Sequence, residues 1–322
     1  MKYIETKKNL MKILWLTIGY RIPGITKVSN NLLAIWAKQL RIHHWIKNVF
    51  VLAPLVFSRL FLDLHSVIQA IYCFFAFSII SSSIYILNDI VDIKKDQVHP
   101  KKKLRPIASG NISKTTAIFV GIILLSSGLG LAFTLDKVVF LIMLAYVFNN
   151  VIYSTYLKHK VIADVLSISI GFMLRFIAGC YVISVEPSRW FMVCGFSLSL
   201  FLAFGKRRAE LEWLSNGTIK RSDARPTLIV YSKEKLNSAL SIMNAICILS
   251  YILFVVDPET VARHHSTAFM YTVPMVIYCL FRYMFKTQEG NGIGPVDIIL
   301  KDKAFIVPIV LWLLVTFSIL MH

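Results

Sequence analysis

Long apolar stretches separated by short basic segments constrain what this chain can fold into more than any other feature. A helix rises about 1.5 Å per residue, so it needs about 20 residues to cross about 30 Å of hydrocarbon. Nine stretches approach this length, although Lys47, Pro54 and Arg59 interrupt the first: 45–62, 66–88, 116–134, 137–157, 161–185, 189–205, 236–256, 268–285 and 304–321. Charged residues make up only 16% of the 322 residues, too few to cover a soluble protein of this size. The sequence therefore predicts an all-α, polytopic membrane protein with about nine transmembrane helices.

The basic residues predict which way these helices cross the membrane. With a cytoplasmic N-terminus, 29 of the 35 lysines and arginines lie in cytoplasmic segments, as the positive-inside rule requires. We therefore expect a multi-pass protein of the inner cell membrane. The same asymmetry explains the net charge of +18. Because no nucleic-acid recognition motif accompanies the charge, nucleic acid is not an expected partner.

The chain divides at about residue 44. Residues 1–44 mix polar and apolar side chains, and their apolar run from Leu10 to Ile18 is too short to span a bilayer. We interpret this segment as a cytoplasmic, interfacial amphipathic helix, in preference to a signal peptide or a disordered arm. Residues 45–322 then form the transmembrane domain. The five cysteines lie singly inside apolar stretches, so neither a disulfide framework nor a zinc site is expected.

An acidic cluster ends the second stretch. Asn88 and Asp89 are followed by Asp92 and Asp96, and a continuous helix places the three carboxylates on one face. Carboxylates this close together repel one another unless a cation lies between them. Mg²⁺ suits this position because it binds a few carboxylates and completes its coordination with water and phosphate oxygens. The alternative is a solvated helix end whose acids pair with neighbouring lysines.

A basic loop follows directly. Lys102, Lys103 and Arg105 lie in a short segment that contains two prolines and ends at Gly110. Acids that hold a metal beside cations that hold phosphate are the two halves of a diphosphate-binding site. The positive-inside rule explains some of these lysines, but it does not explain the carboxylates that precede them.

Further polar residues mark the segment between the fourth and fifth stretches. Tyr153 and Lys158 lie at its start and Asp164 lies at its end. Arg175 lies inside the fifth stretch, where a charge is costly and usually faces a polar cavity or a partner carboxylate. We expect a functional role for Arg175, with a structural ion pair as the alternative.

Cations also gather beside the sixth and first stretches. Lys206 and Arg207 begin a run of three cations at the end of the sixth stretch, and Glu210 follows. Lys47 and Asn48 lie at the start of the first stretch. Such cations are often only topology signals or interfacial anchors. The functional alternative is that they bind phosphate.

Together these motifs resemble those of the UbiA-type intramembrane prenyltransferase superfamily. The resemblance rests on the nine-span pattern, on Asn88 to Asp96, on the Arg-Pro-Ile-Ala-Ser-Gly loop, and on Tyr153 with Lys158. It covers roughly residues 36–321. The resemblance implies a membrane-embedded transferase: an all-helical bundle with a cavity open to lipid and a Mg²⁺-diphosphate site at its cytoplasmic mouth.

One difference from typical family members concerns the end of the sixth stretch. Members that prenylate aromatic acids carry a second acidic motif there, for a second Mg²⁺, whereas this chain has three consecutive cations. With Trp45-x-Lys47-Asn48, this pattern resembles the family's phosphoribosyl branch. The resemblance implies transfer of a 5-phosphoribosyl group from phosphoribosyl pyrophosphate to a polyprenyl (decaprenyl-type) phosphate, with release of pyrophosphate. More phosphate groups call for more cations and fewer carboxylates.

The resemblance also implies roles for the residues. Asp89 and Asp92 bind Mg²⁺ in this scheme, with Asp96 completing the acidic face. The donor phosphates and departing pyrophosphate are assigned to Lys102, Lys103, Arg105, Tyr153, Lys158, Lys206 and Arg207. The acceptor phosphate is assigned to Lys47 and Arg175, and the substrate-binding set is completed by Asn48, Asn88, Asp164 and Glu210. The expected catalytic residues are Asp89, Asp92, Tyr153 and Lys158.

Two other functions stay open at this stage. The nearer one is prenyl transfer from a polyprenyl diphosphate to an aromatic acid such as 4-hydroxybenzoate, against which the missing second acidic motif counts. The other is a transporter or flippase for lipid phosphates. Transporters usually place their charged site near the bilayer midplane between paired repeats, whereas these charges gather at one face. The sequence leaves the oligomeric state open, a homo-oligomer included.

Overall fold

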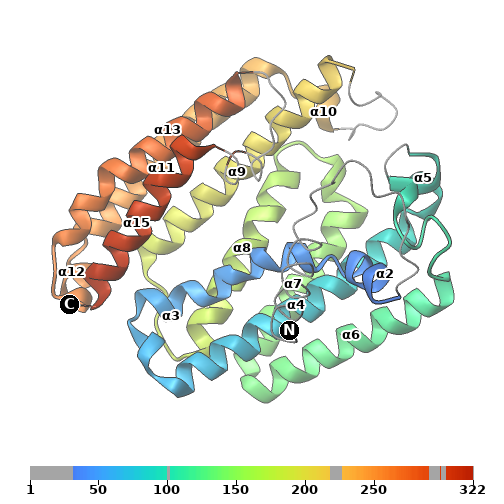
Figure 1. The fold of residues 1–322 in the computed structure, drawn as a ribbon, viewed down its shortest axis with the longest axis horizontal. Coiled ribbons are helices and arrows are strands. Elements are labelled where there is room, and N and C mark those ends of the chain that lie inside the picture. Colours follow the sequence, from blue (N-terminus) through green and yellow to red (C-terminus); the bar gives the residue numbers. More distant parts are fainter. Residues whose placement is uncertain (1–31, 100–101, 218–226, 290–297, 299–301, 322) are drawn as a thin grey trace, which may run out of the picture. The chain divides into compact units, whose positions relative to one another are not determined.

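The computed structural model describes residues 32–99, 102–217, 227–289, 298 and 302–321, and every regular element in these residues is a helix (Figure 1). The elements are, in order, α2 (Leu32–Gln39), η1 (Ile42–Leu52), α3 (Ala53–Phe57), η2 (Leu60–Leu62), α4 (Leu64–Val91), α5 (Ile93–Val98), η3 (Lys102–Leu104), α6 (Lys114–Leu135), α7 (Lys137–Thr155), η4 (Leu157–His159), α8 (Ala163–Val182), α9 (Arg189–Ser215), α10 (Thr227–Val230), α11 (Lys233–Val256), α12 (Pro258–His264), η6 (Ala268–Thr272), α13 (Val273–Gln288) and α15 (Lys303–Met321). The predicted all-α fold is confirmed. Most of the predicted interfacial N-terminal helix lies outside the described residues.

Seven helical segments among the described residues are long and apolar enough to cross a membrane. They are Leu64–Val91, Lys114–Leu135, Lys137–Thr155, Ala163–Val182, Lys233–Val256, Ala268–Gln288 and Lys303–Met321. Each corresponds to one of the predicted stretches. The structure therefore supports a multi-pass membrane protein but does not confirm the count of nine. The cytoplasmic position of the N-terminus stays a prediction.

The first and sixth predicted stretches account for the difference in number. The first is divided into the 3-10 helix η1 and the short helix α3, with Pro54 in the first turn of α3. Beyond α3 the chain leaves helical geometry at Arg59, whose φ is +62°. The sixth lies within the 27-residue helix α9, whose C-terminal part carries the charged residues from Lys206 onward. Neither segment is one long, uncharged apolar helix.

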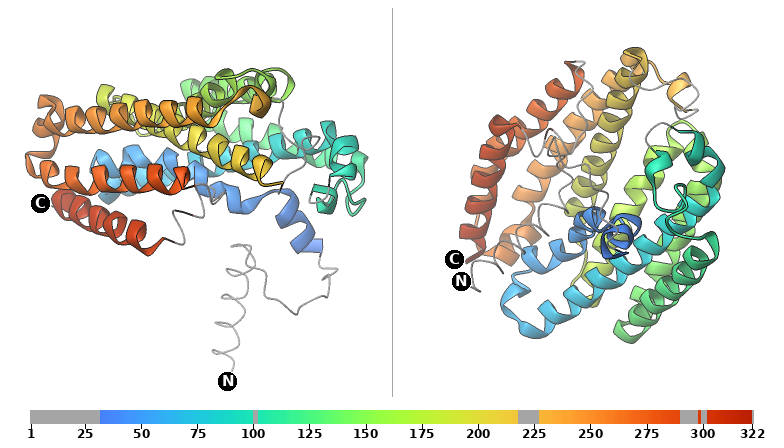
Figure 2. Two further views of the ribbon diagram at one scale, coloured as in Figure 1. Left: turned by 90° about the horizontal axis from the view of Figure 1, so that it is seen from above. Right: turned by 45° about the vertical axis from the view of Figure 1, so that its right-hand side comes forward.

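The chain forms two compact units. Unit 1 comprises Met1–Val49 and Phe74–Leu131, and unit 2 comprises Phe50–Cys73 and Ala132–His322. In unit 2, consecutive neighbours among α7, α8, α9, α11, α13 and α15 pack against one another, and Figures 1 and 2 show α11, α13 and α15 side by side. Helices that follow each other closely in sequence are therefore also neighbours in space.

In unit 1, small residues allow α6 to approach α4 closely. A Cβ atom on Gly128 would lie 2.6 Å from the Ile80 side chain, and the Ser83 hydroxyl donates a 2.7 Å hydrogen bond to the Gly121 carbonyl. Such contacts are typical of helices that associate in lipid, where close packing replaces the hydrophobic effect. A cluster of buried and partly buried apolar residues joins the ends of α4 and α6 to α2 and to the loop before α6: Ile86, Ile107, Ile112, Ala117, Ile35, Trp36 and Leu40. This packing fixes the segments that carry the acidic cluster and the basic loop.

In unit 2, Gly179 of α8 lies against the chain around α3. A Cβ atom at Gly179 would overlap the carbonyl oxygen of Val51. We expect Gly179→Ala to destabilise the protein by about 3 kcal/mol, the upper end of the usual cost of overpacking, because a backbone atom cannot rotate away. Gly130→Ala in α6 is the matched control, since nothing lies within 4 Å of its added Cβ. Thermal unfolding in detergent tests both variants, and equal midpoints would contradict this packing argument.

His264 ends α12 and is only 3% exposed. Burial, with the nearby charges of Arg263 and Arg59, lowers its pKa from 6.5 to about 4. Because the folded pKa lies below the unfolded value, the neutral imidazole contributes stability above pH 6.5 that is lost as the pH falls toward 4. We expect the melting temperature to fall between pH 7.5 and pH 5, and to fall less in His264→Gln. An identical decrease in the variant would show that His264 does not contribute.

Candidate active site

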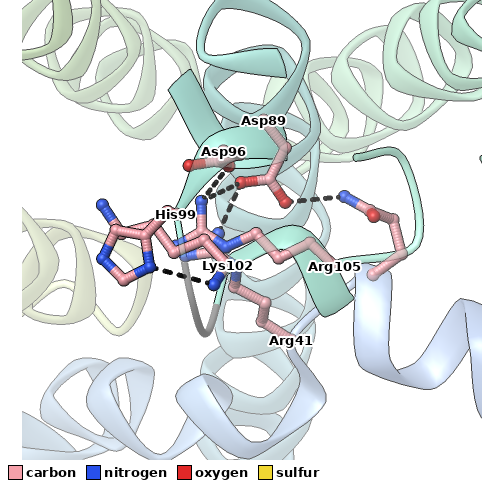
Figure 3. A network of polar contacts seen from close by, with 7 residues as sticks. Arg41, Asp89, Asp96, His99, Lys102 and Arg105 are labelled. Carbon is pink, nitrogen blue, oxygen red and sulfur yellow. Dashed lines mark hydrogen bonds and ion pairs between the residues drawn. The ribbon is translucent and has the colours of Figure 1, made fainter. Parts of the chain in front are cut away.

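The carboxylates of Asp89 and Asp96 come together in unit 1, where α4 ends. The chain pauses for one residue at Asp92, which is half-buried, and then continues as α5. Asp89 is 3% exposed and Asp96 is 2% exposed. The Arg105 Nη1 atom donates to both carboxylates, at 3.0 Å to Asp89 Oδ1 and 2.6 Å to Asp96 Oδ2 (Figure 3). The acidic cluster and the basic loop therefore meet through Arg105, and the expected roles of these residues in binding Mg²⁺ and phosphate stay predictions.

Two further residues contact Asp89, and the sequence analysis did not single them out. Arg41 Nη2 donates to Asp89 Oδ1 at 2.6 Å (Figure 3), and Gln39 Nε2 donates to Asp89 Oδ2 at 3.0 Å. The Arg41 guanidinium also lies over the ring of Tyr85, 4.7 Å from its centroid. Both residues belong to the segment expected to lie at the membrane interface. Their only sequence signal is their position just before Trp45-x-Lys47-Asn48.

The basic loop is held by one contact to His99 and by one from Lys38 of α2. The Lys102 backbone N–H donates to His99 Nδ1 at 3.2 Å (Figure 3), and Lys38 Nζ donates to the Leu104 carbonyl at 2.8 Å. Gly110, with φ of +80°, ends the loop in a conformation that glycine adopts most readily. Lys103 is exposed and Lys102 is half-buried.

The donor atoms at Asp89 and Asp96 are of the kind that Mg²⁺ prefers, because both groups are hard oxygen ligands. Gln39 Oε1 is buried and accepts no hydrogen bond from any described residue, so it adds an uncommitted oxygen. No group of three or more His, Cys, Asp or Glu side chains among the described residues is arranged to hold a metal ion. Asp89 and Asp96 are instead paired with arginines, so a metal ion at Asp89 has to share its oxygens with a guanidinium or displace one.

Asn48 and its neighbours attach the start of η1 to α4. Asn48 is 1% exposed, and its Nδ2 donates to the hydroxyls of Ser78 at 3.0 Å and Ser81 at 3.4 Å. Trp45 Nε1 donates to the Ser82 hydroxyl at 3.0 Å. These contacts anchor the segment that presents Arg41 to Asp89. Lys47 and Asn88 are half-buried, and their substrate-binding roles stay predictions.

A second polar network lies in unit 2, where α8 begins and α9 approaches its end. Asp164 and Arg207 are both 0% exposed, and Arg207 Nε donates to Asp164 Oδ2 at 2.7 Å. Arg207 Nη1 donates to Glu210 Oε2 at 2.8 Å. The Tyr231 hydroxyl donates to Asp164 Oδ1 at 3.3 Å and accepts from the backbone N–H of Ile162 at 2.9 Å. The structure therefore groups three predicted site residues and adds Tyr231, which the sequence analysis missed.

One nitrogen of Arg207 stays available in this network. Its Nη2 is buried and has no hydrogen-bond partner among the described residues. The Tyr153 side chain lies close enough to contribute to the electrostatic environment of Arg207. Lys206, by contrast, is exposed, and Lys158 is half-buried. Arg207 and Arg208, which is 4% exposed, thus face the interior of unit 2, and among these cations only Arg207 pairs with Asp164.

Backbone strain marks the segment that leads to Asp164. Ile162 has φ of +67°, which is rare for a β-branched residue. Such a conformation costs about 1–3 kcal/mol and persists only where the surroundings enforce it. The hydrogen bond from Ile162 to Tyr231 is one such restraint. It fixes the turn that places Asp164 against Arg207.

Arg175 is buried in α8, as expected for a charge inside an apolar stretch. Its Nη1 donates to the Gly171 carbonyl at 2.7 Å, and its Nη2 donates to the Tyr146 hydroxyl at 2.7 Å. The guanidinium also lies 4.6 Å from the ring centroid of Tyr146 and 5.4 Å from that of Phe172. A backbone carbonyl and aromatic faces therefore help to stabilise the charge, and the acceptor role of Arg175 stays a prediction.

Comparison with known proteins identifies the family to which the chain belongs. Residues 51–292 match the model of the UbiA prenyltransferase family. The chain is 29% identical to the decaprenyl-phosphate phosphoribosyltransferase of Mycobacterium tuberculosis, over 90% of this chain and 95% of that one. It is 31% identical to the protein of the same name from Corynebacterium glutamicum, over 85% of this chain and 83% of that one. The uncharacterized protein y4nM of Sinorhizobium fredii is 29% identical over 80% of this chain, which spans 50% of the length of that relative.

Solved structures share the fold. A UbiA homologue from Archaeoglobus fulgidus, solved with GPP and Mg²⁺ bound, superimposes with a TM-score of 0.65. It is 18% identical in sequence, and the match covers 89% of this chain and 100% of that one. The family-model match covers most of the chain and agrees with the relatives, the fold and the apolar helices. The chain therefore belongs to the UbiA prenyltransferase family and is a membrane-embedded transferase.

Proposed function

We propose that this protein transfers a 5-phosphoribosyl group from phosphoribosyl pyrophosphate to a polyprenyl phosphate, depends on Mg²⁺, and releases pyrophosphate. Relatives named decaprenyl-phosphate phosphoribosyltransferase match over most of both chains and support the proposal. The observation that carries it is that the two acids near the end of α9 are paired with cations. Glu210 pairs with Arg207 at 2.8 Å, and Glu212 pairs with Arg208 at 2.7 Å and Lys233 at 3.1 Å. These acids follow three consecutive cations, Lys206 to Arg208, so positive charge prevails at this end of α9, which disfavours a second metal site.

The reaction replaces one bond at the anomeric carbon of the ribose. The bond from this carbon to the diphosphate oxygen breaks, the diphosphate leaves with the electron pair, and an oxygen of the lipid phosphate forms the new bond. Mg²⁺, when bound, neutralises charge that develops on the leaving group. In this proposal Asp89, Asp92 and Asp96 hold the metal, as their oxygen donors allow. Lys102, Lys103 and Arg105 bind donor phosphates through charge-assisted hydrogen bonds.

The residues of unit 2 bind phosphate in the same scheme. Arg207 has its charge fixed by Asp164 and Glu210, and its free Nη2 is a preorganised donor for a phosphate oxygen. Tyr153, Lys158 and Lys206 are assigned to the donor or the departing pyrophosphate. The acceptor phosphate is assigned to Arg175 and Lys47. A phosphate monoester has a second pKa of about 6, so the acceptor is already anionic at pH 7 and needs positioning more than a general base.

We place the reaction at the cytoplasmic face of the inner membrane, from the charge asymmetry of the sequence. The water-soluble donor then arrives from the cytoplasm and the acceptor arrives from the bilayer. The main rival is prenyl transfer from a polyprenyl diphosphate. The Archaeoglobus fulgidus homologue, which shares the fold and was solved with GPP and Mg²⁺, favours that rival.

A pair of assays separates the two functions. Purified protein in lipid–detergent micelles with Mg²⁺ receives labelled phosphoribosyl pyrophosphate and polyprenyl phosphate in one tube. The other tube receives polyprenyl diphosphate and labelled 4-hydroxybenzoate. We expect label in the lipid phase of the first tube only, and its loss when EDTA removes the metal. Lipid-phase label in the second tube alone would reject the phosphoribosyl assignment in favour of prenyl transfer.

A further inference from the structure

Asp89 is surrounded by positive charge from two directions. Its Oδ1 accepts from Arg41 at 2.6 Å and from Arg105 at 3.0 Å. Arg105 also bridges to Asp96 at 2.6 Å, so the two carboxylates and the two guanidiniums form a locally neutral group. Any further cation at Asp89 disturbs this balance. The two arginines differ in how firmly they are attached to it.

Arg105 is held by two carboxylates, whereas Arg41 is held by one. Among the described residues, Asp89 is the only acid that forms a salt bridge with Arg41. The other contact of the Arg41 guanidinium is the face of Tyr85, which leaves its remaining N–H groups uncommitted to acid. Displacing Arg41 from Asp89 therefore breaks one ion pair, whereas displacing Arg105 breaks two.

The backbone is built to present Arg41 to Asp89. Arg41 has φ of +52°, an uncommon conformation for any residue other than glycine. The turn is held by the Ser82 hydroxyl, which donates to the Leu40 carbonyl at 2.9 Å, and by His44 N–H, which donates to the Arg41 carbonyl at 2.7 Å. A conformation that costs free energy and is enforced from several sides points to a function for the side chain it presents.

We propose that Arg41 is a positioning residue that exchanges Asp89 for the diphosphate of the donor when Mg²⁺ binds. A Mg²⁺ ion held by Asp89 would compete with Arg41, which contacts this carboxylate at Oδ1, whereas Gln39 contacts it at Oδ2. The released guanidinium has the planar donor geometry that suits a phosphate group. Metal and diphosphate then bind cooperatively, because each stabilises the arrangement that the other requires. The inference rests on the proposed function only in assuming a diphosphate-bearing substrate.

The proposal gives two effects of opposite sign for one substitution. In Arg41→Gln, Mg²⁺ alone should bind about 10-fold more tightly, because its competitor for Asp89 is gone. At saturating Mg²⁺, inorganic pyrophosphate should bind about 10-fold more weakly, because the released guanidinium is missing. These changes lie within the usual range of coupling between two ligands. A residue that only supports the fold would weaken both interactions.

The test is calorimetric titration of the full chain in lipid nanodiscs, first with Mg²⁺ and then with pyrophosphate at saturating Mg²⁺. Arg59→Gln is the matched control, because Arg59 is also an arginine at positive φ, and its Nε donates to the Leu320 carbonyl instead of to an acid. It should change neither affinity. Arg41→Gly is a second variant that keeps the turn, since glycine adopts this φ readily, and it should reproduce both effects.

Weaker Mg²⁺ binding in both Arg41 variants, or unchanged pyrophosphate binding in both, would overturn the exchange. Because pyrophosphate is common to phosphoribosyl and prenyl donors, these titrations do not depend on which donor the enzyme uses. Failure of phosphoribosyl transfer would leave the Arg41 result standing. Failure of the Arg41 titrations would likewise leave phosphoribosyl transfer standing.

Discussion

Asp89→Asn is expected to lower the transferase activity about 1000-fold while leaving the protein folded. In the proposed mechanism Asp89 holds the metal, and stabilisation of transition-state charge by a metal ion is worth several kcal/mol, of which about 4 kcal/mol corresponds to this factor. The fold should tolerate the change because Arg41 and Arg105, which each lose one ion pair, are 20% and 29% exposed and can be solvated, and Arg105 keeps its pair with Asp96. Initial rates at saturating substrates measure the loss.

Asp136→Asn is the control for this loss. Asp136 caps α7 by accepting from the backbone N–H groups of Val138 and Val139, and asparagine caps a helix about as well as aspartate. The control therefore removes one carboxylate without disturbing a helix, and its rate should equal that of the wild type. Full activity of Asp89→Asn in this comparison would remove Asp89 from the metal site.

Asp164→Asn is expected to have the largest effect on stability. Asp164 and Arg207 are both 0% exposed, so removing the carboxylate charge leaves a buried guanidinium with Glu210 as its remaining acid. Breaking a buried ion pair on one side costs about 3–5 kcal/mol. For a chain of this size the melting temperature should fall by roughly 10 °C. Differential scanning fluorimetry in detergent measures the change.

Glu186→Gln is the comparison for this effect. Glu186 is exposed and forms no salt bridge with any described residue, so its replacement should shift stability by less than about 0.5 kcal/mol. The contrary result is a melting temperature for Asp164→Asn that lies within about 2 °C of that for Glu186→Gln. Such a result would contradict a tightly buried network. It would mean that water reaches Arg207.

The positions of most membrane-spanning helices could be predicted from the sequence, because the hydrocarbon thickness fixes the length of an apolar helix. The first stretch failed as a single helix for a local reason, since Pro54 and the positive φ of Arg59 interrupt it. The sixth was predicted as an apolar span, but its helix continues into the charged segment to Ser215. Hydropathy therefore predicts where apolar helices lie better than it predicts where they end.

The candidate site could be predicted only where its residues are close in sequence. Asp89, Asp96 and Arg105 lie within one short segment, and helical periodicity with a tight loop brings them together. Arg41 reaches Asp89 from 48 residues away, and Asp164 reaches Arg207 across 43 residues. Such pairings depend on tertiary packing, which no local pattern encodes. The sequence identified Arg207 as a cation of interest, but only the helical phase of α9 separates it from the exposed Lys206.

The most direct test of the central claim follows the phosphorus atom of the lipid. Polyprenyl phosphate is incubated with phosphoribosyl pyrophosphate, Mg²⁺ and the purified protein, and the mixture is followed by phosphorus NMR. The proposed function predicts that the lipid phosphomonoester signal is replaced by a phosphodiester signal, with one pyrophosphate released for each lipid converted. A lipid monoester that stays unchanged, while polyprenyl diphosphate is consumed in a parallel incubation with 4-hydroxybenzoate, would contradict phosphoribosyl transfer.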